Sequence, residues 1–204
     1  MEFVVIGSDA QWEALTAEAP GVTWTRAKEK DNLENHVSAT AFFILTDNAT
    51  FNNTAITQPV FINNVDTTLA KMNAGKNVFR VNGWNGFLKR TAWEIAGDAS
   101  ADLQLIAGAL NKKLLPVADE PGLVAGRIVA MIINEAYFTV GDGISGKAET
   151  DTAMKLGTNY PYGPFEWASI IGIEHIYSLL DTLTVTDKRY TPALLLISEA
   201  TKNK

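Results

Sequence analysis

Five short runs of apolar and β-branched residues in the first half of the chain restrict its fold more than any other feature. Each run has four or five residues and is bounded by Gly, Asn, Asp or Pro: Phe3–Ile6, Val22–Thr25, Phe42–Leu45, Pro59–Ile62 and Asn77–Val81. Short apolar strands separated by polar or helical connections are typical of a parallel sheet that is covered on both faces. The sequence therefore predicts an α/β domain over residues 1–118.

The second half of the chain has the periodicity of helices. Pro121 and Gly122 precede an apolar run that extends to Val140, and proline suits the first turn of a helix because no hydrogen bond is lost there. Further helices are expected over Glu149–Leu156, Pro164–Leu183 and Thr191–Thr201. These patterns predict an all-helical domain over residues 119–204, following the α/β domain.

Charge and composition exclude several kinds of partner and site. The net charge is −6, so phosphate backbones and anionic lipid are repelled, and we expect neither nucleic acid nor a membrane as partner. The apolar run holds Arg127 and Glu135, which a bilayer span would rarely carry. There is no cysteine, and His36 and His175 lie far apart, so no metal site is expected. Without a visible targeting segment, the cytoplasm is the expected location.

Two stretches of the helical half resemble the C-terminal domain of the 3-hydroxyacyl-CoA dehydrogenases. DEPGLVAGRIVAMIINEA at 119–136 is similar to the family's D-x-P-G-F-V-x-N-R-hydrophobic-N-E-A helix. DTAMKLGTNYPYGPFEWASIIGIEHI at 151–176 is similar to its D-x-A-M-K-x-G…P-x-G-P-hydrophobic-E signature. The resemblance implies a Rossmann-like domain ahead of the helices, here reduced in length. It also implies that the helical domain packs subunits together, so we expect a homodimer. For the motif residues themselves we expect scaffold roles.

The resemblance further implies hydride transfer between NAD and the 3-position of an acyl-CoA. In the family a histidine is the general acid/base, a glutamate orients it, and an asparagine in the helical domain assists. Here Asn82 stands at the histidine position, Glu94 follows twelve residues later at the glutamate position, and Gly126 stands at the asparagine position. An amide has no titratable proton near neutral pH, so Asn82 cannot shuttle one.

The turn after the first strand departs from the dinucleotide-binding pattern. Gly7 is the single candidate cofactor contact, because Asp9 and Trp12 stand where the pattern G-x-G-x-x-G would place glycines. Ser8 and Gln11 instead fit a capping box, which begins a helix without any ligand. We expect no cofactor, or NAD if the family activity is retained.

Two further features bear on the substrate. Thr67 and Thr68 stand where the family places a Ser/Thr pair, although Asp66 and Thr67 could equally cap a helix over Leu69–Met72. Only residues 27–40 separate the second and third strands, so we expect the family's CoA-holding helical hairpin to be absent, with His36 in an exposed loop.

Three functions follow from these observations. The first is a catalytically impaired homologue that acts as a binding or assembly module, with a small molecule or an acyl-CoA as ligand. The second is an active NAD(P)-dependent 3-hydroxyacyl-CoA oxidoreductase of fatty-acid metabolism with an altered site. The third is a purely structural homodimer.

Overall fold

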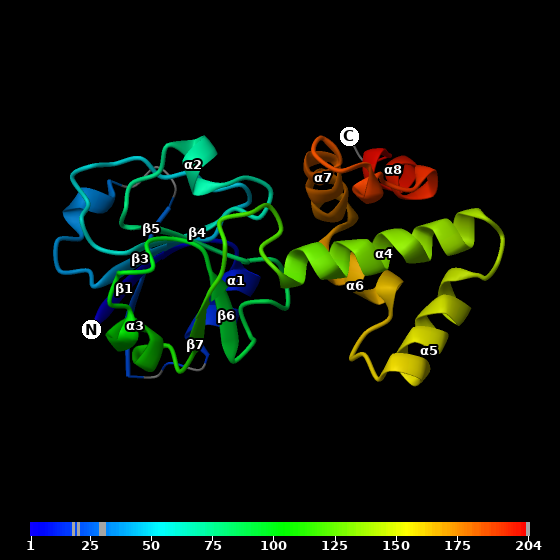
Figure 1. The fold of residues 1–204 in the computed structure, drawn as a ribbon. Coiled ribbons are helices and arrows are strands. Elements are labelled where there is room, and N and C mark those ends of the chain that lie inside the picture. Colours follow the sequence, from blue (N-terminus) through cyan, green and yellow to red (C-terminus); the bar gives the residue numbers. More distant parts are fainter. Residues whose placement is uncertain (18, 20, 29–31, 203–204) are drawn as a thin grey trace. The chain divides into compact units, whose positions relative to one another are not determined.

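The computed structural model describes residues 1–17, 19, 21–28 and 32–202. The chain divides into two compact units, Met1–Leu123 and Val124–Lys204. Figure 1 shows a sheet with short helices in the first unit and helices alone in the second. The expected fold class, a reduced parallel α/β domain followed by a helical domain, is confirmed.

A parallel sheet of five strands forms the first unit, in the order β2-β1-β3-β4-β5. Each strand lies within one residue of its predicted bounds at either end: β1 (Glu2–Ile6), β2 (Thr23–Arg26), β3 (Ala41–Ile44), β4 (Val60–Asn63) and β5 (Val78–Val81). All residues of β3, β4 and β5 are buried, as expected for parallel strands covered on both faces. The strand order reverses between β1 and β3, which places a topological switch point there.

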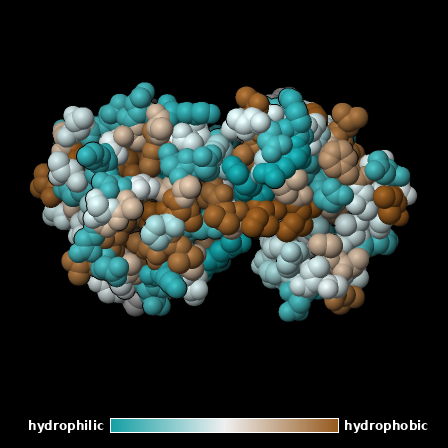
Figure 2. Space-filling view, in the orientation of Figure 1, coloured by the Kyte–Doolittle hydropathy of each residue, from teal (hydrophilic) through white to brown (hydrophobic). Residues whose placement is uncertain are grey.

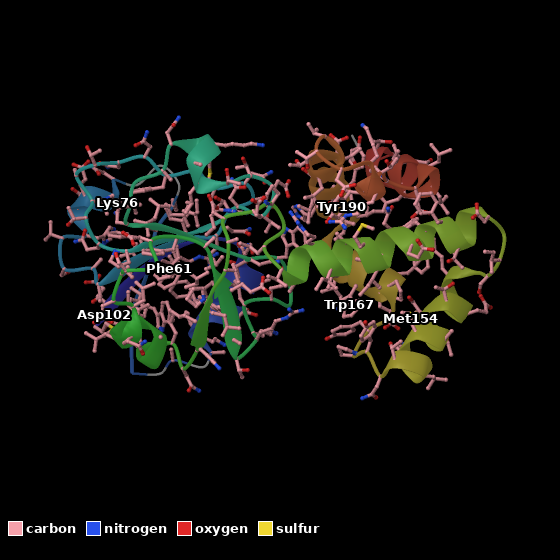
Figure 3. All side chains as sticks on the ribbon, in the orientation of Figure 1. Phe61, Lys76, Asp102, Met154, Trp167 and Tyr190 are labelled. Atoms are coloured by element: carbon pink, nitrogen blue, oxygen red, sulfur yellow. The ribbon has the colours of Figure 1, made fainter. Side chains whose placement is uncertain are left out.

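Two clusters of apolar side chains cover the two faces of this sheet. One contains Phe3, Phe43 and Phe61 together with Leu15 of α1 (Asp9–Thr16) and Ile106 of α3 (Gln104–Ala109). The rings of Phe43 and Phe61 stack with their centroids 4.9 Å apart; Phe61 is labelled in Figure 3. The opposite cluster contains Val4, Phe42, Ile62 and, at its margin, Met72 of α2 (Leu69–Met72).

The strands β6 (Ala92–Ile95) and β7 (Lys113–Pro116), and helix α3, were not predicted. β6 and β7 form a separate parallel pair, and a single antiparallel bridge from Arg80 to Ala96 joins β5 to β6. Glu94, Lys113 and Pro116 interrupt the apolar pattern of these two strands. The sequence pattern of β6 and β7 therefore does not predict strands.

The second unit is helical throughout its regular part. It contains α4 (Ala125–Gly141), α5 (Lys147–Thr158), α6 (Pro164–Ile171), α7 (Ile173–Thr184) and α8 (Leu194–Thr201), with a short 3-10 turn at Lys188–Tyr190. Its core includes Ile133, Ile176, Leu179 and Leu196, and the buried rings of Trp167 and Tyr190 are labelled in Figure 3. Among the described residues, no helix combines the length and the apolar character needed to cross a bilayer.

Two expectations for the helical half were wrong. The first helix begins at Ala125 and not at Pro121, because Gly122 and Leu123 have φ angles of 84° and 50°. A right-handed helix excludes positive φ. The single helix expected from Pro164 to Leu183 is two helices, since Gly172 has a φ of 99° and separates α6 from α7.

Candidate functional site

The carboxyl ends of the parallel strands meet at one edge of the sheet, beside the switch point between β1 and β3. In open α/β sheets this is the edge that binds ligands. Gly7 follows β1, Leu45 follows β3, Asn63 ends β4, and Asn82 and Gly83 follow β5. The side chains at these strand ends therefore form the candidate site.

The Gln11 side chain ties three of the strand ends together. Gln11 is buried, and its Nε2 donates to the carbonyl oxygens of Leu45, at 2.6 Å, and Gly83, at 3.0 Å. Its Oε1 accepts from the backbone N–H of Ser8 at 3.0 Å, while its own N–H donates to Ser8 Oγ at 3.3 Å. The predicted capping box is confirmed. The Gln11 amide therefore caps α1 and also joins the end of β1 to the end of β3, on the two sides of the switch point.

Asn63 adds a second amide bridge at the same edge. Its Nδ2 donates to the Leu45 carbonyl oxygen at 3.1 Å, and its Oδ1 accepts from the Gly83 N–H at 2.9 Å. A Cβ on Gly83 would lie 2.7 Å from Asn63 Cγ, so only glycine lets the chain pass this close. The carbonyl of Leu45 is thus bonded by two buried amides, and the strand ends are closed by hydrogen bonds within the protein.

Gly7, the predicted cofactor contact, is the residue that makes room for the Gln11 amide. A Cβ at position 7 would lie 3.0 Å from Gln11 Oε1. The Gly7 carbonyl accepts from Arg26 Nη2 at 3.1 Å, and the same nitrogen lies 2.6 Å from Asp9 Oδ1. The guanidinium also lies 5.6 Å from the ring centroid of Trp12. Asp9 and Trp12, which replace the glycines of the dinucleotide pattern, both contact Arg26.

Asn82 has a buried donor that the protein does not use. Its Oδ1 accepts from the Trp84 N–H at 3.0 Å, which fixes the orientation of the amide. Nδ2 is buried and has no hydrogen-bond partner among the described residues. Leaving such a group unpaired costs roughly 1–3 kcal/mol. An amide held in this way offers hydrogen-bond donors to an acceptor atom.

Glu94 lies on β6, half-buried, on the strand that the Arg80–Ala96 bridge joins to β5. Asn82 lies two residues after the bridged Arg80, and Glu94 lies two residues before the bridged Ala96. Burial lowers the pKa of Arg90, and the negative charge of Glu94 partly offsets that effect. The two residues at the family's histidine and glutamate positions thus lie on segments that this single bridge joins.

The motif at residues 151–176 forms the corner between α5 and α6. Asp151 is buried, and its carboxylate accepts from the N–H groups of Phe165, at 2.8 Å, and Glu166, at 3.2 Å. These are unpaired donors of the first turn of α6. A Cβ on Gly163 would collide with the Asp151 carboxylate, and Glu166 pairs with Lys155. Asp151, Lys155, Gly163 and Glu166 are therefore used in local structure.

Comparison with known proteins identifies the type of domain that the helical unit resembles. Residues 122–203 match the family model described as 3-hydroxyacyl-CoA dehydrogenase, C-terminal domain. This helical unit is therefore similar to the C-terminal domain of the 3-hydroxyacyl-CoA dehydrogenases.

Two curated relatives illustrate the extent of the match. The 3-hydroxyadipyl-CoA dehydrogenase of Escherichia coli K12 is 44% identical over 92 residues, which are 44% of this chain and 19% of the relative. The 3-hydroxybutyryl-CoA dehydrogenase of Clostridioides difficile is 35% identical over 101 residues, which are 48% of this chain and 36% of the relative. The chain thus matches between about a fifth and just over a third of the length of these relatives.

Solved structures extend the likeness to the whole fold. The (S)-3-hydroxybutyryl-CoA dehydrogenase of Ralstonia eutropha aligns with a TM-score of 0.75 at 16% identity, covering 97% of this chain and 92% of that one. At this identity the likeness concerns the fold alone. It agrees with a Rossmann-like sheet domain followed by the helical domain of 3-hydroxyacyl-CoA dehydrogenases.

The remaining predicted site residues lie as follows. Thr68 is the N-cap of α2, with its Oγ1 accepting from the Lys71 N–H at 3.2 Å, and the Thr67 N–H donates to Asn64 Oδ1 at 3.2 Å. The alternative that Asp66 and Thr67 cap this helix was wrong by one position, since Thr68 has the extended backbone of an N-cap. Gly126 lies buried in the first turn of α4. The substrate roles of Thr67 and Thr68 stay predictions.

The connection between β2 and β3 is described only in part. Residues 29–31 lie outside the described residues, so the expected absence of a CoA-holding hairpin falls partly on them. A 3-10 turn at Leu33–Asn35 ends at His36, which is half-buried and less exposed than expected. In the described part of the chain, no group of three or more His, Asp or Glu residues is arranged to hold a metal ion.

Sequence reasoning missed the bridging roles of Gln11 and Asn63. The capping box identified Gln11 as a helix residue, but its bonds to Leu45 and Gly83 span 34 and 72 residues. Asn63 and Asn64 gave a visible signal, since two amides at the end of an apolar strand are unusual in a buried position.

Proposed function

We propose that this 3-hydroxyacyl-CoA dehydrogenase-like chain binds an acyl ligand without transferring a hydride, and acts as a binding or assembly module. The observation that carries this proposal is the buried Gln11 amide, whose hydrogen bonds close the switch point between β1 and β3. Dinucleotide binding in a Rossmann-like fold requires that crevice to be open and its first turn to offer free N–H groups. Here the N–H groups of Ser8 and Gln11 are bonded within the capping box.

The energetic cost of opening this site supports the same conclusion. A pyrophosphate approaching the first turn would compete with hydrogen bonds of a buried amide, each costing roughly 1–3 kcal/mol when lost without replacement. It would also meet the carboxylate of Asp9, which pairs with Arg26. A backbone turn that binds phosphate has the opposite character, with unpaired donors and no acid.

The chemistry available at Asn82 agrees with binding and not with proton transfer. The amide cannot change its protonation near neutral pH, and its oxygen is already bonded to Trp84. The Nδ2 donor is buried and unpaired, and an acceptor such as the carbonyl oxygen of a thioester or a 3-oxoacyl group has the chemistry to pair with it. We infer that this donor orients an acyl ligand whose acceptor atom replaces the missing partner.

Two measurements test this proposal. The full chain, mixed with NADH and acetoacetyl-CoA, should give no saturable oxidation of NADH, whereas acetoacetyl-CoA alone should raise the melting temperature, because a ligand of the folded state stabilises it. Asn82→Ala should remove that rise. Asn85→Ala, at an exposed position of the same segment, is the matched control and should keep it. Saturable NADH oxidation by the unaltered chain would overturn the proposal.

We also propose that the helical unit forms a homodimer. Large apolar residues remain exposed along one face of α4, among them Val124 at 48%, Ile128 at 54% and Phe138 at 39%, and Figure 2 shows hydrophobic residues gathered along this helix. Light scattering after gel filtration should give twice the chain mass. Ile128→Glu should give a monomer, while Ile144→Glu, in the turn after α4, should leave the dimer intact. A monomeric unaltered chain contradicts this part of the proposal.

A further inference from the structure

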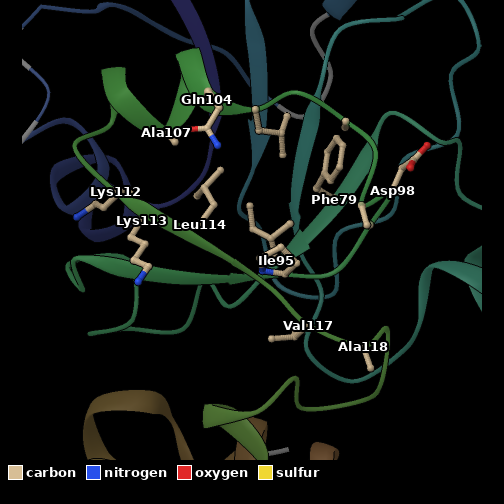
Figure 4. Close-up of a pocket in the computed structure, with 15 residues that line it drawn as sticks. Phe79, Ile95, Asp98, Gln104, Ala107, Lys112, Lys113, Leu114, Val117 and Ala118 are labelled. Carbon is tan, nitrogen blue, oxygen red and sulfur yellow. The ribbon is translucent and has the colours of Figure 1, made fainter.

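We propose that the first unit holds a second ligand site, formed by different elements from the strand-end cluster, and that it takes a small carboxylate with an apolar body. The site is a cavity of about 700 Å³ between α3, the segment that follows β6, and β7 (Figure 4). Its lining residues all lie between Phe79 and Ala118, within the first unit. Ligand pockets in proteins usually have volumes of about 300–1,000 Å³.

The inner wall of this cavity is apolar. Phe79 and Ile95 are buried core residues that reach its surface, and Leu114 and Leu103 add half-buried aliphatic side chains. Gly97 packs so closely on the Phe79 ring that a Cβ there would collide with it. The Gly97 backbone therefore lies directly against the ring, and the wall formed by these apolar side chains suits a hydrocarbon group.

One end of the cavity is cationic. Figure 4 shows Lys112 and Lys113 together at one end and Asp98 at the other. Lys112 is only 7% exposed, which is rare for lysine, and its Nζ lies 5.9 Å from the ring centroid of Trp93. These two lysines put positive charge at this end of the cavity, beside its apolar wall, and positive charge attracts an anionic head group.

The carboxylate at the opposite end is held within its own loop. Asp98 Oδ1 accepts from the N–H of Ser100 at 2.9 Å and from its Oγ at 2.6 Å. These bonds lower the pKa of Asp98 below its ordinary value and keep the carboxylate directed at the loop. The two charged ends of the cavity therefore remain separate, and the anionic group of a ligand belongs at the lysine end.

The edge of β7 favours a small molecule over an added peptide strand. Lys113 and Val117 donate their N–H groups to the carbonyl oxygens of Thr91 and Ile95 on the β6 side. Because successive N–H groups of a strand point to alternate sides, the Leu114 N–H points away from β6. The next N–H on that side would belong to Pro116, which has none. A single backbone donor cannot support strand addition, which requires a row of N–H and C=O groups. The Leu114 N–H can instead donate a hydrogen bond to one oxygen of a carboxylate.

Calorimetric titration of the full chain with octanoate and with octylamine tests the site, because the two probes share a chain length and differ in the sign of their charge. Octanoate should bind saturably, and octylammonium should not. Lys113→Gln should weaken octanoate binding about tenfold or more, the expected effect of losing a hydrogen bond to a charged group. Lys89→Gln, at an exposed position that does not line the cavity, is the matched control and should bind as the unaltered chain does.

A second variant tests the cavity itself. Ala107 lines the space between α3 and β7, and Ala107→Phe should fill it and abolish octanoate binding while the circular dichroism spectrum stays that of the unaltered chain. Three results would overturn the proposal: no saturable octanoate binding below its micelle concentration, equal binding of both probes, or unchanged octanoate binding in Lys113→Gln. If Ala107→Phe fails to fold, the Lys113→Gln variant and the comparison of octanoate with octylamine still test the proposal.

Discussion

Arg80, at the centre of the first unit, donates a 2.6 Å hydrogen bond from its guanidinium to the carboxylate of Asp119. The Arg80 side chain is completely buried, and it also donates to the carbonyl oxygens of Asn64, at 2.8 Å, and Val65, at 3.2 Å. Burial lowers the pKa of Arg80, and the hydrogen bond that Arg80 donates to Asp119 opposes that shift. One buried cation thus ties β5 to the segment after β4 and to the chain that follows β7.

Removing the carboxylate should leave this cation without its counter-charge. We expect Asp119→Ala to lower the free energy of unfolding by about 2–3 kcal/mol, somewhat less than for a fully buried pair because Asp119 is 28% exposed and three backbone carbonyls remain. Urea unfolding followed by tryptophan fluorescence measures this change. Glu13→Gln removes an exposed carboxylate of the same unit and should change stability little. Equal stability of both variants would contradict the role given to Asp119.

Gln11→Glu tests whether the amide donors close the strand ends. The substitution keeps the shape of the side chain but turns Nε2, which donates to Leu45 and Gly83, into an oxygen that faces two carbonyl oxygens. We expect it to destabilise the first unit at neutral pH by more than Gln11→Ala, which should cost about 2–3 kcal/mol for the buried bonds lost.

The pH dependence of Gln11→Glu has a predictable sign. Burial beside carbonyl oxygens disfavours the ionised carboxylate, so its folded pKa should rise above the unfolded value. Stability should then recover as the pH falls through the folded pKa, because the protonated group again donates. Urea titrations between neutral and mildly acidic pH measure this recovery, with Gln58→Glu as the matched control. A variant as stable as the unaltered chain at neutral pH would show that Gln11 does not close the edge.

Glycine-to-alanine exchanges in the helical unit should have opposite effects at two positions. At Gly163 a Cβ collides with the Asp151 carboxylate that caps α6, so Gly163→Ala should cost about 1–3 kcal/mol through overpacking and a weakened cap. At Gly157, inside α5, a Cβ meets no atom within 4 Å, and Gly157→Ala should stabilise by up to about 1 kcal/mol through helix propensity. Calorimetric melting temperatures that move in the same direction for both variants would contradict this assignment.

The parts of the fold that the sequence predicts are those with local signals. The five strands of the sheet are short runs rich in apolar and β-branched residues, and the start of α1 follows from Ser8 and Gln11, which are three residues apart. β6 and β7 carry charged residues and a proline, so their pairing depends on tertiary contacts that no short pattern contains. Likewise, the break at Gly172 is a single left-handed residue within an apolar stretch that otherwise has helical periodicity.

The sequence predicts the candidate site residues by position and not by chemistry, and their roles stay predictions. The spacing of Asn82 and Glu94 within the resembling segment identifies one residue directly after β5 and one on β6, and a single bridge joins these two strands. The unused Nδ2 of Asn82 follows from its turn bond to Trp84 together with burial. That burial depends on the packing of distant segments, so the sequence alone cannot show it.

Acid should weaken the corner between α5 and α6 through Glu166. The hydrogen bond and charge of Lys155, and the N–H of Gly163, lower the pKa of Glu166 below its ordinary value of 4.5. A carboxyl whose folded pKa is lowered contributes stability above its unfolded pKa and loses it as the pH falls through the folded value. The helical unit should therefore lose stability as the pH falls below about 4.5. Glu166→Gln and Lys155→Met should each reduce this acid dependence in melting curves recorded across that range. A Glu166→Gln variant with an unchanged acid dependence would show that other carboxylates account for it.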